Sequence, residues 1–310
     1  MSATIFGRVS RGGAGSTLAR VAASLVVASL GISGDAFAQS AAAAKDPCDD
    51  KVLFKADPLG DGALLAASLG FAGLSEAIIS TGEIRPQQID ANFDTRRLLP
   101  IDRAAITQSL DASADAFSNG GLFVTLGFAV LDPILSGIRG GREAALVDLT
   151  MYSEAIAFSW GLTNLAKIGF RRPRPMAYIE RERAIEAGQD PATYNNTSTD
   201  STLSFYSGHT AITASISATA AYLAFARSPN SMRAWGTLTG GFVLTSFVAV
   251  ERVRSAAHFP TDVIAGALAG AGIGMIVVHL HRYDSESKRP IWVGALPTAG
   301  GGGVMVGGAF

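Results

Sequence analysis

The stretch ERVRSAAHFPTDVIAGALAGAGIGMIVVHLH (residues 251–281) decides the fold of this chain. From Pro260 to His281 it is apolar and rich in Ala, Gly and Leu, with little of the alternation that marks a strand, so it predicts an α-helix. Proline is favoured as the first residue of a helix, which places the helix start at Pro260. His258 therefore lies just before the helix and Asp262 in its first turn, where the two side chains can meet.

Five further apolar segments share this character, and the set predicts an all-α protein built as a bundle of about six core helices. The six segments are Gly62 to Ser80, Gly121 to Ile138, Ala144 to Ala166, Thr210 to Ala226, Ala234 to Val250, and Pro260 to His281. In the last segment Gly266, Gly270 and Gly274 recur every fourth residue, a spacing that lets a neighbouring helix approach closely.

The stretches between these segments are more polar. Ile101 to Phe117 predicts an amphipathic surface helix. Met176 to Phe205 carries Pro191 and a run of Asn, Ser and Thr, which predicts a long loop that shapes substrate choice. Near the C-terminus, Gly300 to Gly303 separate two apolar stretches, and we expect a short hairpin or an irregular tail.

The N-terminus has the pattern of an export signal. Arg8, Arg11 and Arg20 lead into the apolar stretch Val21 to Ile32, and Ala36-Phe37-Ala38 fits a cleavage site. We expect a signal peptide at residues 1–38, a flexible linker at 39–57, a helical domain at 58–285 with its motif-bearing core at 144–281, and a C-terminal tail at 286–310. This pattern predicts export to the periplasm, with an uncleaved membrane anchor as the alternative.

The apolar helices also raise the question of a membrane. A spanning helix needs roughly 20 apolar residues, and charges at mid-bilayer are expensive. The first three apolar segments are interrupted by Glu76, Asp132, Asp148 and Glu154. Three spans after a cleaved signal would also place Lys167 in the cytoplasm. We therefore favour a soluble periplasmic bundle and keep inner-membrane association as the open alternative.

Groups that bind phosphate gather at two helix ends. Lys167 ends the third apolar segment and supplies a point charge, while Arg174 follows with a planar fork that can grip two oxygens. Ser207-Gly208-His209 directly precedes the fourth segment. Ser207 can cap that helix, whose first N–H groups favour an anion, and Gly208 lets the backbone come close to a ligand. His209 is then near the same anion.

A third cluster completes the set. Arg252 adds another cation, and Asp262 can fix the tautomer of His258 and support its positive form. Each cluster alone has an ordinary interpretation: a basic surface patch, a capping turn with an incidental histidine, or a capping carboxylate beside a surface histidine. Together and in this order, the three clusters predict one pocket that holds and splits a phosphate ester without a metal.

Charge, cysteine and histidine counts narrow the chemistry. The formal net charge is -1, so the chain has no basic field and we expect no nucleic-acid partner. A single cysteine excludes an internal disulfide framework and a cysteine-rich metal site. His279 and His281 are expected to meet the negative end of the last helix rather than a metal, and we predict no metal site. The remaining cations near the clusters are expected to be solvated surface: Arg171, Arg172 and Arg254.

These clusters resemble the motifs of the type 2 phosphatidic acid phosphatase and vanadium-dependent haloperoxidase superfamily: Lys-x6-Arg-Pro, Pro-Ser-Gly-His and Ser-Arg-x5-His-x3-Asp. The chain has KIGFRRPRP from Lys167, YSGH from Tyr206 and ERVRSAAHFPTD from Glu251. The resemblance covers Ala144 to His281. It departs from the pattern at two positions, with Tyr206 in place of the usual proline and Glu251 in place of the usual serine. Neither position supplies the core chemistry.

The resemblance implies an acid phosphatase/vanadium haloperoxidase-like helical fold and a role for each motif residue. It implies that phosphate binding falls to Lys167, Arg174, Arg252, Ser207 and Gly208. His258 would attack phosphorus and form a phosphohistidine, Asp262 would orient His258, and His209 would protonate the leaving oxygen. The resemblance implies neither a metal nor another cofactor.

Our leading hypothesis is an exported phosphatase for phosphate monoesters, with lipid phosphates and isoprenoid pyrophosphates among the candidate substrates. The same residues would bind vanadate, so a vanadate-dependent haloperoxidase is one alternative. A non-catalytic envelope protein that binds anionic lipid head groups is the other, although binding alone does not require two histidines and Asp262. The sequence leaves the organic half of the substrate and the oligomeric state open.

Overall fold

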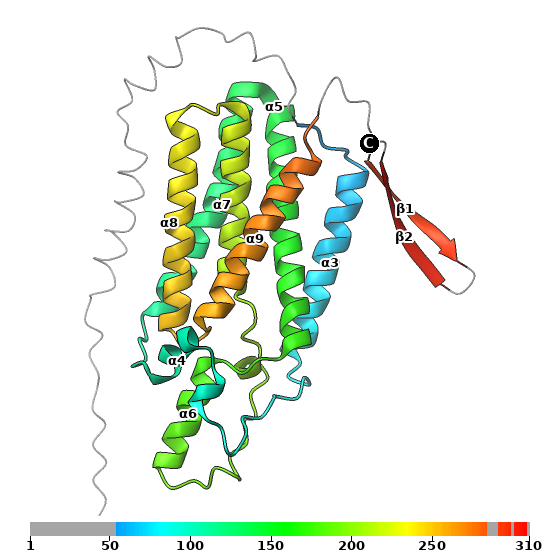
Figure 1. Ribbon diagram of the computed structural model, residues 1–310. Helices are drawn as coiled ribbons and strands as arrows, with labels where there is room; N and C mark the ends of the chain where they lie inside the picture. Colours follow the sequence, from blue (N-terminus) through cyan, green and yellow to red (C-terminus); the bar gives the residue numbers. More distant parts are fainter. Residues whose placement is uncertain (1–53, 284–290, 299–300, 309–310) are drawn as a thin grey trace, which may run out of the picture. The chain divides into compact units, whose positions relative to one another are not determined.

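The computed structural model describes residues 54–283, 291–298 and 301–308. The predicted signal peptide and most of the predicted linker lie outside these residues. The described chain is helical apart from one terminal hairpin, which confirms the all-α prediction (Figure 1). Its elements are α3 (Gly60–Ser80), η1 (Thr95–Arg97), α4 (Pro100–Thr107), α5 (Ala114–Phe170), α6 (Pro175–Glu186), η2 (Asp200–Thr202), α7 (Gly208–Arg227), α8 (Met232–Arg254), α9 (Pro260–Leu280), β1 (Ile291–Thr298) and β2 (Gly301–Gly308).

Helix α7 packs against α5, α8 and α9 (Figure 1). Its contact with α9 depends on the glycines that repeat every fourth residue. A Cβ atom at Gly266 would stand 2.7 Å from the carbonyl oxygen of Ser207, and Cβ atoms at Gly270 and Gly274 would also collide with α7 carbonyls. The predicted close approach is therefore confirmed, and it sets the start of α9 directly beside Ser207.

Helix α5 consists of two arms that fold back on each other (Figure 1). Gly141 joins them at φ 82° and ψ 178°, a backbone conformation that glycine adopts without steric cost. The Tyr152 hydroxyl donates to the Asp132 carboxylate across the arms at 2.9 Å. The arms correspond to the two predicted segments at 121–138 and 144–166. The second arm carries Lys167 to its end.

Two polar stretches differ from their predictions. The helix expected over 101–117 is interrupted, since α4 ends at Thr107 and α5 begins at Ala114. Between them Asp111 accepts the backbone N–H of Ser113 at 2.9 Å, which turns the chain. The loop expected over 176–205 contains α6. That helix begins with Pro175 and is rich in Ala, Glu and Arg, which are strong helix formers. A search for apolar segments overlooks a helix whose apolar residues are interrupted by charged ones.

Two hydrophobic clusters hold the bundle. The larger one includes Met151, Tyr152 and Leu223, and it also contains Phe54 from the predicted linker. The backbone of Phe54 pairs with Arg282. The smaller cluster lies where α4 and α6 meet the turn before α9, and its buried members are Ile89, Ala105, Ala177, Tyr178 and Phe259. This second cluster fixes the polar segments against the turn that carries His258.

The C-terminal tail forms the hairpin that the sequence predicted as one of two outcomes. Strands β1 and β2 pair antiparallel, with Ile291 opposite Gly308 and Thr298 opposite Gly301.

Three helical stretches are long and apolar enough to cross a membrane: α3, a window within Ala114–Glu186, and α9. Asp132 and Asp148, two of the four acidic residues that argued against spanning, are buried and pair with Arg233 at 2.8 Å and with Arg227. Glu154 is also buried and lies 3.6 Å from His281, whereas Glu76 is exposed and accepts the Asn164 amide at 3.0 Å. Paired carboxylates inside a bundle do not face lipid, so they do not prevent these helices from spanning.

The outward side chains of the bundle helices are strongly apolar. Exposed large apolar residues include Leu69, Leu74 and Ile78 on α3, Phe242, Val243 and Phe247 on α8, and Ile264, Leu268 and Ile276 on α9. Contiguous apolar surface of this kind marks contact with a membrane or a partner rather than with water. The structure thus favours membrane association over the soluble bundle that we expected from the sequence.

Candidate active site

The three motif clusters meet at one end of the bundle. Lys167 lies in the last turn of α5 and Arg252 in the last turn of α8, while His258 lies in the turn before α9. Burial, followed by the positive charges of Arg174, Arg252 and Lys167, holds the pKa of His258 well below its ordinary value of 6.5. Charges that act on the imidazole in this way lie close to it, so the predicted cations and His258 share one site.

His258 is held by a bent and buried turn. Ala256 has a left-handed backbone with φ 54°, and its carbonyl oxygen accepts the N–H of Met176 at 3.0 Å. The imidazole is almost fully buried, and its Nδ1 lies 2.7 Å from the carbonyl oxygen of Ser204. A carbonyl can only accept, so Nδ1 carries the proton of the neutral ring. Nε2 is left with the lone pair.

Asp262 does not contact His258 as we expected from the spacing. Its nearest oxygen is 4.0 Å from Nδ1 of His258, which is too far for a hydrogen bond. The carboxylate instead accepts the Ser204 hydroxyl, the backbone N–H of Phe259 at 2.9 Å and the Arg172 guanidinium at 2.6 Å. Asp262 therefore positions His258 through Ser204, the residue whose carbonyl holds Nδ1.

Arg172 is a partly buried crosslink, which corrects its assignment to the solvated surface. Its guanidinium donates to Thr261 at 2.8 Å, to Asp262 at 2.6 Å and to Asp102 at 2.7 Å. The group also stacks over the Phe259 ring, with 4.0 Å between guanidinium carbon and ring centroid. Arg172 thus ties α4 to the first turn of α9.

Arg171 and Arg254, the other two arginines expected at the solvated surface, make different contacts from Arg172. Arg254 is half exposed and pairs with Asp111 and Glu251, in agreement with its expected surface role. Arg171 is only partly exposed and donates to the carbonyl oxygen of Arg85. Arg172 hydrogen-bonds to Asp262, which positions His258, whereas the hydrogen bonds of Arg171 and Arg254 go to other residues.

Arg174 and Arg252 each retain an unused donor. Arg174 donates to Asp200 at 2.6 Å, and Arg252 donates to Asp115 and, at 3.3 Å, to Ser118. The Nε atom of each guanidinium is buried without a hydrogen-bond partner among the described residues. A buried donor without a partner costs free energy. A tetrahedral oxyanion would satisfy both donors.

The start of α7 adds backbone donors. Its first internal hydrogen bond runs from the N–H of Ala211 to the carbonyl of Ser207 at 3.0 Å. The N–H groups of Gly208, His209 and Thr210 consequently have no acceptor within the helix. The hydroxyl of Ser207 pairs with Thr210 at 3.0 Å rather than capping an N–H. These amides and the positive end of the helix dipole favour an anion.

The remaining motif groups are fixed by contacts with α5. Nε2 of His209 lies 2.7 Å from Oδ1 of Asn119, which stands in the first arm of α5. A Cβ atom at Gly208 would come within 3.1 Å of the Thr163 methyl group, so a glycine gives the close packing here. Sequence reasoning missed Asn119, Arg172 and Ser204, because their roles depend on contacts between distant segments.

A comparison with protein-family models agrees with the motif resemblance. A family model described as the PAP2 superfamily matches residues 148–286. Among solved structures, the crystal structure of the first transmembrane PAP2 type phosphatidylglycerolphosphate phosphatase from Bacillus subtilis is similar over 70% of this chain and 93% of that chain, with 18% sequence identity and a TM-score of 0.41. No curated protein matches. The stretch that matches the PAP2 superfamily model covers less than half of the chain and contains all three motif clusters.

Proposed function

We propose that this protein is a phosphatase that hydrolyses phosphate monoesters, and in particular lipid phosphates, through a phosphohistidine and without a metal ion. The observation that carries the proposal is the buried His258, whose Nδ1 is fixed by the Ser204 carbonyl while three cations act on the ring. The match of residues 148–286 to the PAP2 superfamily model supports a phosphatase.

Substrate binding rests on fixed positive groups. Lys167, Arg174 and Arg252 contact the non-bridging phosphate oxygens, and the amides at Ser207-Gly208 and the following turn add hydrogen bonds. Donors held in place before the reaction stabilise the charge that develops in the transition state without reorganising. In phosphoryl transfer this stabilisation, together with positioning, supplies most of the catalysis.

The reaction proceeds in two steps. Nε2 of His258 attacks phosphorus, the bond from phosphorus to the ester oxygen breaks, and the leaving oxygen takes a proton from His209. Protonated His209 has a second N–H to give, because Asn119 occupies only one ring nitrogen. Water then attacks phosphorus while His209 takes its proton. The phosphorus–nitrogen bond breaks, and inorganic phosphate leaves with neutral His258 restored.

The acidic groups beside the cations support a mechanism without a metal. Asp200 pairs with Arg174, and Asp115 pairs with Arg252. Each carboxylate is thereby matched to a guanidinium, whereas a Mg²⁺ site draws on carboxylates that are free to bind the ion. The three cations take over the charge neutralisation that a metal ion would provide.

An apolar groove between α3 and α5 supports a lipid substrate. Its lining includes Ala67, Phe71, Phe158, Gly161 and Leu162. Lys167 follows Leu162 on the same helix by about 8 Å along the axis, at 1.5 Å per residue. A lipid tail in this groove would place its phosphate near Lys167. The apolar outer surface of the bundle gives such a lipid a route to the groove.

The proposal is tested with the full chain in detergent micelles. Phosphate release is measured from a long-chain lipid phosphate and from a water-soluble phosphomonoester, each with and without EDTA. We expect faster turnover of the lipid, no loss with EDTA, and a fall in kcat of at least about a thousand-fold for His258→Ala, since the nucleophile is removed. Quenching in alkaline detergent with ³²P-labelled substrate should trap label on the wild-type chain, because the phosphorus–nitrogen bond of a phosphohistidine survives base but not acid.

The matched control is His279→Ala, because His279 pairs with Tyr222 at the other end of α9. This variant should turn over lipid phosphate at the wild-type rate. The phosphohistidine mechanism is wrong if His258→Ala keeps wild-type turnover.

A further inference from the structure

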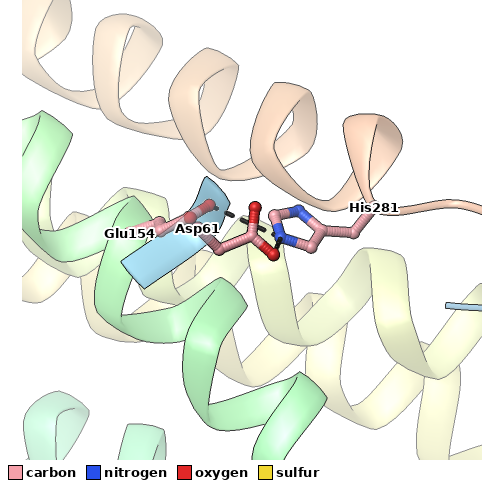
Figure 2. A group of neighbouring side chains, drawn as sticks. All are labelled: Asp61, Glu154 and His281. Atoms are coloured by element: carbon pink, nitrogen blue, oxygen red, sulfur yellow. Dashed lines mark ion pairs between the residues drawn. The ribbon is translucent and has the colours of Figure 1, made fainter. Parts of the chain in front are cut away.

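Three potential metal ligands converge at the end of α9 that lies farthest from His258 (Figure 2). Asp61 stands in the first turn of α3, Glu154 in the second arm of α5, and His281 caps the C-terminus of α9. Since α9 rises about 1.5 Å per residue, roughly 30 Å separate this group from the phosphate-binding end. The group therefore takes no part in phosphate chemistry.

The distances within the group match those between ligands of one ion. Nε2 of His281 lies 3.3 Å from a carboxylate oxygen of Asp61 and 3.6 Å from one of Glu154. The three ligand atoms all lie within 4.8 Å of one another. Bonds of 2.0–2.2 Å to a tetrahedral zinc ion place neighbouring ligand atoms about 3.3–3.6 Å apart. The side chains point toward one another in Figure 2.

The tautomer of His281 suits metal binding. Its Nδ1 lies 2.9 Å from the carbonyl oxygen of Val277, so Nδ1 carries the proton of the neutral ring. Nε2, which faces the two carboxylates, then presents a lone pair. Histidines that bind metals commonly donate their other N–H to a backbone carbonyl in this way. Asp61 is supported similarly, since its carboxylate accepts the backbone N–H of Asp57 at 2.6 Å.

The buried side chains of this group lack hydrogen-bond partners and positive charge, both of which a bound cation would supply. The side chains of Glu154 and His281 are only 2% and 7% exposed. Even so, one Glu154 oxygen and Nε2 of His281 have no hydrogen-bond partner among the described residues. Within the described chain, His281 is the sole ion-pair partner of either carboxylate. A buried Glu154 carboxylate with the partly exposed Asp61 carboxylate beside it is costly without a matching cation, and a divalent ion would balance both.

We propose that Asp61, Glu154 and His281 bind one divalent transition-metal ion, with Zn²⁺ as the best match. One imidazole and two carboxylates form a ligand set that zinc accepts, with water completing the tetrahedron. Asp61 is 20% exposed and provides the entry path. The ion joins α3, α5 and α9 at one end of the bundle. This site departs from the expectation from sequence that the chain binds no metal.

The test uses the purified full chain, stripped with a chelator and then titrated with Zn²⁺ or Co²⁺. We expect one Zn²⁺ per chain, a higher Tm with Zn²⁺, and the visible absorption of tetrahedral Co²⁺. His281→Gln should weaken Zn²⁺ binding by at least about 100-fold, because even the loss of an outer-shell partner costs 10–100-fold. It should also abolish the Co²⁺ absorption.

His279→Gln is the matched control, because it changes a histidine of the same helix end that contacts Tyr222 instead of the carboxylates. This variant should keep both the Zn²⁺ affinity and the Co²⁺ spectrum. If His281→Gln does not fold, Asp61→Asn gives the same readout at a more exposed position. Absence of stoichiometric Zn²⁺ in the wild type, or unchanged Zn²⁺ affinity in the ligand variants, overturns the proposal.

The proposal of a metal site and the proposal of a phosphatase mechanism can be contradicted independently of each other. His281→Gln should still form the phosphohistidine, and His258→Ala should still bind Zn²⁺. EDTA should lower the Tm of the wild-type chain without lowering phosphate release below that Tm. Loss of phosphate release with EDTA in His281→Gln would instead indicate a metal at the phosphate site.

Discussion

At His258 the burial of the ring and the charges around it act in the same direction. Both disfavour the protonated imidazole, and the pKa lies well below 6.5. The neutral ring keeps a lone pair on Nε2, which a nucleophile requires. Arg174 and Arg252, the proposed phosphate ligands, thus also keep the nucleophile unprotonated before the substrate arrives.

This coupling predicts the pH dependence of kcat/KM. His258 protonates only as the pH falls through a value below 6.5, so the acid limb should lie below 6.5. Arg174→Gln removes the charge with the largest effect on the ring, which raises the pKa of His258 and moves the acid limb to higher pH. The measurement is kcat/KM against pH, corrected for protonation of the substrate.

Arg254→Gln is the control for this profile, because Arg254 is half exposed and pairs with Asp111 and Glu251. It should leave the acid limb in place. An acid limb above pH 6.5 in the wild type, or equal shifts in both arginine variants, would contradict the assignment of the limb to His258.

The sequence could predict which residues gather at the site but not how they are held. Lys167, Arg252 and His258 stand at helix ends, and a bundle brings helix ends together. The orientation of Asp262 could not be predicted. The four-residue spacing favours contact with His258, yet the carboxylate at this helix position accepts the N–H of Phe259 and the guanidinium of Arg172. Both choices depend on tertiary packing.

At the scale of elements, apolar runs predicted the bundle helices to within a few residues. The same criterion missed α6, which carries five charged residues among its twelve. The amphipathic pattern over 101–117 joined α4 to the start of α5. The glycine repeat was more informative, because a spacing of four residues places Gly266, Gly270 and Gly274 on one face of α9. That face is the one that meets α7.

The glycine contact predicts different outcomes for two neighbouring substitutions. A Cβ atom at Gly270 would collide with the backbone of Ala211, so Gly270→Ala forces α7 and α9 apart. We expect a loss of about 1–3 kcal/mol in unfolding free energy, as for other overpacked cores. Because Ser207 lies on the same contact, phosphate release should also fall. Unfolding in detergent and the lipid phosphate assay provide the two measurements.

Gly272→Ala supplies the control on the same helix. A Cβ atom there meets nothing within 4 Å, and alanine is the better helix former by about 1 kcal/mol. This variant should be as stable as the wild type or more stable. If Gly270→Ala and Gly272→Ala have equal stability, the close approach of α9 to α7 does not contribute to the fold.

At the scale of the whole bundle, α3 connects the two proposed sites. It begins beside His281, where Asp61 contacts that ring, and ends at Ser80. Just beyond, the carbonyl of Gly82 accepts the hydroxyl of Thr199, next to the Asp200 that pairs with Arg174. If α3 crosses a membrane, the Zn²⁺ site and the phosphate site face opposite sides. An exported N-terminus would then place phosphate hydrolysis in the cytoplasm, contrary to the predicted periplasmic activity.

Cysteine labelling decides between these arrangements. In a Cys48→Ser background, Leu59→Cys marks one end of α3 and Glu83→Cys marks the other, and both positions are exposed. A membrane-impermeant maleimide should label only one of the two cysteines in intact cells, and both after permeabilisation, because a spanning α3 separates its ends by the bilayer. With an exported N-terminus the labelled position is Leu59→Cys. Labelling of both in intact cells means that α3 does not span, and a periplasmic phosphatase then becomes the consistent reading of the export signal.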